Sequence, residues 1–192
     1  RKEIDFVGCS TRQEDLGKVK YLEVKGSRLA FLNYVTLDTN PKIPEGAQVF
    51  PNIFNEIEIL SKIEEAKKQS DFVVLLLHWG GKVDYGFYPH NEQVKQAKQF
   101  IKAGADLIIG HHTHTFQAHQ KMLGKEVFYS LGNFCFADIH TEGKISPIRN
   151  SGKESAFVRI NLDMETREYE SEIVPFKIKI EDFHLKAAPE LR

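Results

Sequence analysis

The chain has 192 residues, 41% of them hydrophobic, which is enough for one globular domain with a sizeable core. Its net charge of -1 excludes the basic surface that nucleic-acid binding needs, and no acidic tail is present. No stretch approaches the roughly 20 apolar residues of a membrane helix, and no signal sequence stands at the start. We therefore expect these residues to form a soluble domain.

The first predicted elements are a hairpin and a helix. Residues 18–24 and 27–37 have the composition of two strands joined by a turn at 25–26, and a proline-rich loop follows over 38–51. From Asn52, which we expect to be the N-cap, apolar residues fall on one helical face. These residues are Ile53, Ile57, Leu60, Ile63 and Ala66.

Two apolar runs separated by a helix form the strongest pattern in the chain. Residues 72–77 end at His78, and residues 106–110 end at His111. Between them, residues 93–103 carry apolar side chains at helical spacing. Strand, helix and strand is the economical interpretation, and a crossover of this length makes the two strands parallel.

Both histidine groups should lie at one edge of the sheet, because parallel strands joined in this way have their C-terminal ends on the same side. That edge is where open α/β sheets bind ligands. His112 and His114 follow the second strand, and alternate residues of an extended segment point the same way. With strands roughly 4.8 Å apart, we expect His78 to meet His112 and His114 over a shared ion.

The C-terminal third predicts more strands and one long loop. Residues 115–122 look irregular, residues 126–131 look like a short strand, and residues 138–153 look like a loop of the length that is usually functional or mobile. Residues 156–162 alternate as a half-buried strand, with a partner strand over 168–174.

Further expectations concern single features. Pro175 should interrupt strand pairing, and the polar tail beyond Phe183 should fray. The two cysteines, Cys9 and Cys135, are too few for a disulfide framework, and Cys135 is expected to be a small buried side chain. We find no internal repeat and no linker that would divide the chain.

A metal ion is the natural occupant of the histidine cluster, because neutral imidazole is a common ligand of Zn, Fe, Mn and Ni. His78, His112 and His114 could form a single zinc site with an open position for water, or part of a two-metal site with carboxylates supplied elsewhere. Alternatively, they hydrogen-bond to loop backbone. Surface or local hydrogen-bonding roles are expected for the isolated histidines, which are His90, His119, His140 and His184.

Several motifs between residues 77 and 134 occur in a characteristic order. They are Leu77-His78-Trp79-Gly80, Asp84-Tyr85, the run from Ala103 to His114, and Tyr129-Ser130-Leu131-Gly132-Asn133-Phe134. In these motifs the chain resembles the capsule-synthesis proteins called CapA or PgsA, which belong to the calcineurin-like metallophosphoesterase superfamily. The resemblance covers most of residues 1–140, and the later residues match only as strands that complete such a domain.

The resemblance implies an α/β fold of metallophosphoesterase type, a two-sheet sandwich flanked by helices, with two divalent ions (Mn, Fe or Zn) at the strand ends. His78 and His112 would hold one ion and His114 the other. His111, which stands at the glycine of the superfamily's Gly-His-x-His motif, and Asn133 are the candidate catalytic residues beside these ligands. For Asn133, plain turn geometry is the alternative.

The resemblance also has departures. The superfamily supplies an Asp-x-His pair, a bridging Asp and an Asn ligand from an N-terminal half, and no such motif precedes His78. Residues 1–192 are therefore expected to be the C-terminal portion of a single domain that holds half of a dinuclear site. Asp84 and Tyr85 are candidates for substrate binding at the mouth of the site, with a structural role in the loop as the alternative.

The function implied by this family is hydrolysis in poly-gamma-glutamate capsule production. Two ions about 3.5 to 4 Å apart would lower the pKa of a bridging water and neutralise charge on a phosphoryl oxygen. The partners would be a capsule polymer or phosphoester substrate and membrane-bound capsule synthesis proteins. An extracytoplasmic location in the cell envelope, with an anchor before Arg1, is also implied. The alternatives are a non-catalytic envelope scaffold for polymer handling or export, and a single-zinc hydrolase complete in this chain.

Overall fold

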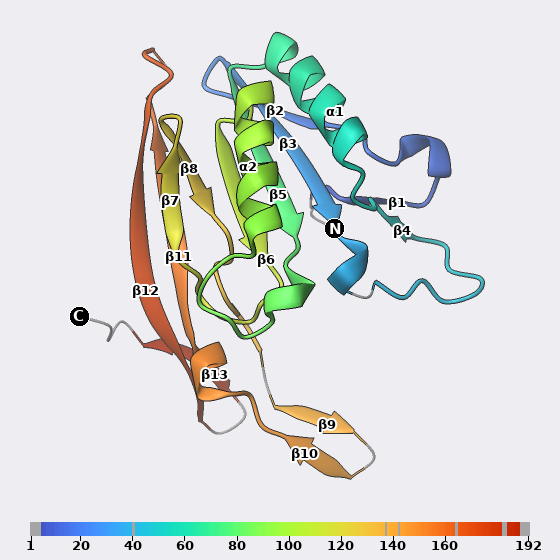
Figure 1. Ribbon diagram of the computed structural model, residues 1–192, viewed down its shortest axis with the longest axis vertical. Coiled ribbons are helices and arrows are strands. Elements are labelled where there is room, and N and C mark those ends of the chain that lie inside the picture. The colour runs from blue at the N-terminus through green and yellow to red at the C-terminus, as the bar shows by residue number, and fades with distance from the viewer. Residues whose placement is uncertain are drawn as a thin grey trace.

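The computed structural model describes residues 5–39, 41–136, 138–141, 143–163, 165–181 and 184–188. A six-stranded sheet forms its centre (Figure 1). In spatial order its strands are β2 (Lys20–Val24), β3 (Ser27–Val35), β5 (Phe72–His78), β6 (Leu107–His111), β8 (Lys125–Phe128) and β7 (His119–Met122). The four middle strands are parallel, and β2 and β7 pair antiparallel at the two edges.

The predicted hairpin and the predicted parallel strands are both confirmed. Strands β2 and β3 are joined by the turn at 25–26, and β5 lies directly beside β6 in a register that pairs His78 with His111. The apolar runs of β5 and β6 are covered on both faces, which explains why they do not alternate with polar residues.

Helix α1 (Glu56–Gln69) begins at Asn55, whose side-chain oxygen accepts a hydrogen bond from a backbone N–H of the first turn. The prediction of Asn52 as the N-cap was wrong. The buried Asn52 side chain accepts from the Gly17 N–H at 2.9 Å and donates to the Asn33 carbonyl at 3.0 Å instead.

The predicted apolar face of α1 was only partly correct. Ile63 and Ala66 are buried against the sheet as expected, but Ile57 is 82% exposed and Ile59 is fully buried. Because α1 starts at residue 56, Ile53 lies outside the helix. The helix face that meets the sheet therefore differs from the predicted one and includes Ile59 instead of Ile57.

Helix α2 (Asn91–Ala103) confirms the predicted crossover between β5 and β6, and it lies beside α1 on the same face of the sheet (Figure 1). At its start, the Gln93 side chain accepts a hydrogen bond from the His90 N–H at 2.8 Å. At its end, Gly104 has a φ of 121°, which residues with a side chain rarely adopt. Within the described part of the chain, neither helix combines the length and apolar character needed to cross a lipid bilayer.

A second sheet covers the face of the central sheet opposite the helices. Its antiparallel strands are β11 (Glu154–Leu162), β12 (Tyr169–Glu181) and β13 (His184–Ala188). Alternate side chains of β11 pack against the central strands in one apolar cluster, whose members include Phe72, Val74, Leu107, Phe128, Val158, Ile160 and Leu162. The α/β class with two sheets and flanking helices is therefore confirmed.

Residues 138–153, predicted as a loop, contain secondary structure. Strands β9 (Ile139–Thr141) and β10 (Lys144–Ser146) form a hairpin that extends away from both sheets in Figure 1, and a 3-10 helix, η4 (Asn150–Lys153), follows it. The remaining short elements are β1 (Cys9–Ser10), paired with β4 (Phe50–Pro51), and the 3-10 helices η1 (Gln13–Asp15), η2 (Leu37–Thr39) and η3 (Gly81–Val83).

Several predictions after residue 115 were wrong. Residues 119–122 form β7 rather than irregular structure, and Cys135 is exposed. Pro175 does not interrupt β12, where it pairs with Ala156 of β11. Among the described residues, β13 pairs with residues 177–181 of β12 and not with the proline, and a missing N–H costs little where no strand is paired. Residues 184–188 of the expected frayed tail form β13.

Candidate metal centre

The predicted histidines gather at the carboxyl edge of the central sheet. His78 is the last residue of β5 and His111 the last of β6, and His112 and His114 follow directly. The close packing behind them requires Gly110, because a Cβ at that position would stand 1.9 Å from the Tyr129 carbonyl oxygen.

His78 and His112 point their ring nitrogens at each other. The distance from His112 Nδ1 to His78 Nε2 is 3.0 Å, and the ring centroids are 4.8 Å apart. Two imidazole nitrogens bound to one ion at about 2.0 to 2.1 Å would also stand about 3 Å apart. The observed distance therefore fits both a hydrogen bond between the two rings and two ligands of one shared ion.

His114 is oriented by Asn133. Its Nδ1 lies 2.8 Å from Asn133 Oδ1, while Asn133 Nδ2 donates to the Gly152 carbonyl at 2.9 Å. Because the amide nitrogen is committed to Gly152, the oxygen must accept, so Nδ1 of His114 carries the proton. The lone pair is then on Nε2, the arrangement found in metal-binding histidines with an oriented ring.

The backbone around the cluster is not extended. His112 has a φ of 111° and His114 a φ of 59°, a region that residues with a side chain enter at a cost. The argument that alternate residues of an extended segment share a direction was therefore wrong, although the two rings still lie 6.0 Å apart. A tight turn brings them together.

The protonation of the cluster favours neutral imidazole. Burial, followed by the neighbouring imidazoles, lowers the pKa of His78 to about 4. Burial also lowers the pKa values of His111 and His112, and for His112 the nearby carboxylate of Asp84 partly opposes this effect. Neutral rings are the form that binds metal ions.

A cavity of about 470 Å³ opens between the two sheets beside the histidines. His78, His111, His112 and His114 line one side together with Asn133. The facing residues are mostly apolar and include Leu131, Phe134, Phe136, Ala156, Phe157, Val158 and Phe176. The edge of the sheet thus combines a polar cluster with an apolar wall.

The two candidate substrate residues occupy different surroundings. The Tyr85 ring stacks on His114 at 5.4 Å between centroids, and its backbone N–H donates to the Thr113 carbonyl at 2.8 Å. Asp84 is exposed and close enough to His112 to influence its pKa. Neither residue lines the cavity between the sheets.

Two neighbours of the cluster were not predicted. Phe136 packs edge-on against His114 at 5.0 Å, and the Arg149 guanidinium lies 4.3 Å from the centre of the Tyr85 ring. Both come from irregular segments, so no periodic spacing in the sequence marks them. Of the isolated histidines, His90 caps α2 and His119 stacks on Phe128, while the side chains of His140 and His184 lie outside the described residues.

The donor set fits part of a metal centre. His78 and His112 converge, and His114, whose Nδ1 is bonded to Asn133, keeps its Nε2 free. Among the side chains that the structure describes, however, no three His, Cys, Asp or Glu residues are grouped closely enough to hold an ion. The described side chains therefore do not by themselves form a complete coordination sphere.

The sequence comparison identifies the family. The family model for the bacterial capsule synthesis protein PGA_cap matches residues 1–138, which include all the predicted site residues. The chain belongs to the PGA_cap family. The resemblance to capsule-synthesis proteins is thereby confirmed.

Two curated relatives support the PGA_cap assignment. The capsule biosynthesis protein CapA of Bacillus anthracis is 32% identical over 152 residues, which cover 76% of this chain and 36% of that protein. The PGA biosynthesis protein CapA of Bacillus subtilis (strain 168) is 33% identical over 142 residues, which cover 71% of this chain and 36% of that protein. The chain therefore spans little more than a third of the length of these relatives.

Solved structures show more distant likenesses. A 5'-nucleotidase precursor from Thermus thermophilus matches 87% of this PGA_cap chain and 32% of its own, with 18% identity and a TM-score of 0.44. The NAD nucleotidase NadN of Haemophilus influenzae matches 88% of this chain and 33% of its own, with 13% identity and a TM-score of 0.45.

Proposed function

We propose that this chain carries the histidine ligands of a metal-dependent hydrolase centre of phosphoesterase type that serves capsule biosynthesis. The supporting observation is the 3.0 Å approach of His112 Nδ1 to His78 Nε2 at the carboxyl edge of the sheet. The strained backbone at His112 adds to this, since such conformations cluster at functional sites.

His78 and His112 would hold one ion, and His114 would offer Nε2 to a second. A bound divalent ion would supply a Lewis acid and an acidified water. The histidines themselves stay neutral and act as ligands, and Asn133 keeps His114 in the tautomer with Nε2 free. His111, half-buried beside His78, would limit the access of water to the ligands.

The remaining ligands, including carboxylates, would come from residues outside this chain, which would then be the C-terminal portion of one domain. Support comes from the part of the relatives that the chain spans, 36% of each. The substrate would be a capsule polymer such as poly-gamma-glutamate or a phosphoester.

The test replaces His112 with Ala in the full-length protein and measures metal content, hydrolysis of generic phosphodiesters and capsule output. We expect metal affinity to fall at least tenfold, because the loss of even an indirect metal contact lowers metal affinity or activity about 10- to 100-fold. The rate of hydrolysis and the capsule output should fall with it. His119→Ala, an exposed histidine on β7, is the matched control. If capsule output survives the loss of metal, the proposed hydrolase function is contradicted.

A non-catalytic scaffold for polymer handling is the second candidate. Under this proposal, the His112→Ala protein would lose metal and keep its capsule output. A single-zinc hydrolase complete in this chain predicts instead one tightly held ion per purified chain, which elemental analysis measures.

We also propose an extracytoplasmic location in the cell envelope and contacts with membrane-bound capsule synthesis proteins. The support is that one relative is named for capsule biosynthesis and the other for PGA biosynthesis. Fractionation and crosslinking of the full-length protein test both points. Recovery of the protein only in the cytoplasm would contradict the location.

A further inference from the structure

Arg149 has an anchored backbone and an exposed side chain. The residue before it, Ile148, is 7% exposed, and its N–H donates to Asp138 Oδ1 at 2.9 Å. The Arg149 carbonyl accepts from the N–H of the buried Gly152 at 2.9 Å. The guanidinium therefore extends from a fixed point.

The side chain of Arg149 contacts an aromatic ring that also contacts the histidine cluster. Its guanidinium carbon lies 4.3 Å from the centre of the Tyr85 ring, and the same ring stacks on His114. A guanidinium that packs on a ring by its face keeps its in-plane N–H groups free for a planar, two-point contact with a carboxylate or phosphate.

A second connection ties Arg149 to the same histidine. Asn133 donates to the carbonyl of Gly152, three residues after Arg149, and its oxygen bonds His114. The Arg149 side chain and the His114 ring thus contact the same Tyr85 ring, and the 3-10 helix that follows Arg149 is hydrogen-bonded to the Asn133 side chain that orients His114.

Arg149 also differs from the other arginines in its charge partners. Within the described residues, Arg149 forms no salt bridge. Each of the other described arginines lies within salt-bridge distance of a carboxylate; they are Arg12, Arg28, Arg159 and Arg167. The unpaired cation beside the site is available to a ligand.

We infer that Arg149 binds an oxyanion of the substrate, a carboxylate or a phosphate group, and so determines which substrates are held beside the histidines. This inference rests on the proposed function, since it places the substrate at that site. Arg149 lies beyond residues 1–138, which match the family model, so the inference concerns a part of the chain that the match does not cover.

The test uses the metal-loaded full-length protein and measures the affinity for two probes, inorganic phosphate and glutarate, by calorimetry. We expect Arg149→Ala to weaken binding about tenfold or more, because a hydrogen-bonded charge contributes about 1.5 to 3 kcal/mol. Arg149→Lys should recover part of the lost affinity, because lysine restores the positive charge but cannot make the two-point contact. The probe that loses more affinity identifies the oxyanion.

Arg159→Ala is the matched control, because Arg159 is exposed on β11 and pairs with Glu172. Its affinities for both probes and its metal content should equal those of the wild type. Wild-type protein that binds neither probe, Arg149→Ala protein that binds both unchanged, or Arg149→Ala protein that loses its metal would each overturn the inference. If the wild type binds metal and anion but hydrolyses nothing, the inference stands and the hydrolase fails.

Discussion

At the scale of single residues, the amide of Asn133 determines how His114 can act. A free imidazole carries its proton on either nitrogen, but the Gly152 carbonyl fixes the amide and the amide fixes the proton on Nδ1. Which nitrogen of His114 keeps a free lone pair therefore depends on a residue 19 positions away.

Replacing Asn133 with Ala should weaken metal binding about 10- to 100-fold, because the ring of His114 loses its orientation and its fixed tautomer. Asn133→Asp, which keeps an oxygen acceptor, should be affected less. Metal titration of the full-length protein measures both. Asn161→Ala, an exposed residue of β11, is the control, and equal affinities for the Asn133→Ala and control proteins would contradict the role of the amide.

The low pKa of His78 predicts that the metal-free fold weakens in acid. The folded pKa of about 4 lies below the ordinary value of 6.5, so between these pH values the unfolded chain binds a proton that the folded chain does not. The stability due to neutral His78 is present above pH 6.5 and is lost as the pH falls toward 4.

Urea unfolding at pH 7 and pH 5 with a chelator present measures this dependence. The urea midpoint of the wild type should be lower at pH 5 than at pH 7. The decrease should be smaller in His78→Gln. His119→Gln, which removes an exposed histidine, should behave like the wild type. An unchanged pH dependence in His78→Gln would show that other groups are responsible.

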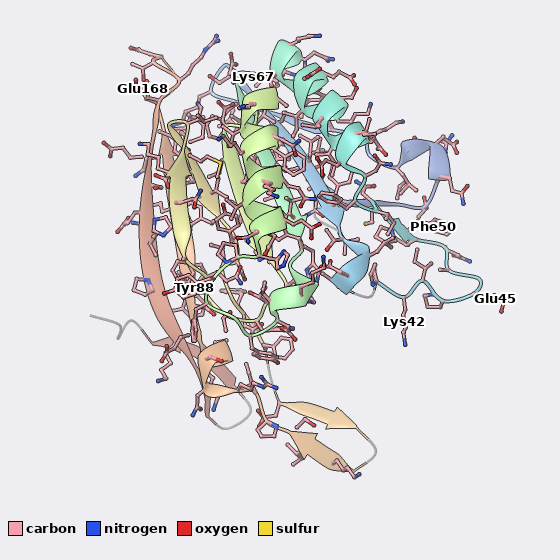
Figure 2. The ribbon with its side chains drawn as sticks, viewed as in Figure 1. Lys42, Glu45, Phe50, Lys67, Tyr88 and Glu168 are labelled. Atoms are coloured by element: carbon pink, nitrogen blue, oxygen red, sulfur yellow. The ribbon has the colours of Figure 1, made fainter. Side chains whose placement is uncertain are left out.

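At the scale of elements, Asp106 secures the end of the central sheet away from the histidines. Its carboxylate, 5% exposed, lies 2.7 Å from Lys67 Nζ and 2.8 Å from Lys125 Nζ, and it accepts from the Val73 N–H at 2.9 Å. Figure 2 shows Lys67 at one end of the helices and Tyr88 toward the other. Asp106 thereby connects α1, β5 and β8 just before β6 begins.

We expect Asp106→Asn to lower the free energy of unfolding by about 2 kcal/mol, because three hydrogen bonds to a buried charge are weakened together. Glu172→Gln is the control, since the exposed pair between Glu172 and Arg159 should contribute little. Chemical denaturation of both variants measures the difference. Equal denaturation midpoints for Asp106→Asn and Glu172→Gln would mean that solvent screens the lysines even though the carboxylate is buried.

At the scale of the whole molecule, the candidate centre lies where two sheets meet. The histidines come from the carboxyl ends of β5 and β6, while the opposite wall of the cavity comes from β11 and β12, which follow much later in the chain. The apolar cluster between the sheets fixes the distance between these walls.

The sequence by itself determined the two middle strands of the central sheet and the position of the histidines at their ends. The unbroken apolar runs, the helical spacing between them and the length of the crossover together require parallel strands that end on one edge. His78 and His111 then follow from their places at the ends of those strands, and the family follows from the motifs around them.

Only the tertiary structure decided the contacts between distant segments. The turn that brings His112 to His78, the bond from Asn133 to His114 and the packing of Arg149 on Tyr85 each join residues without a shared periodic pattern. Sequence periodicity reports which face of an element is buried, whereas these contacts depend on how separate elements pack against one another.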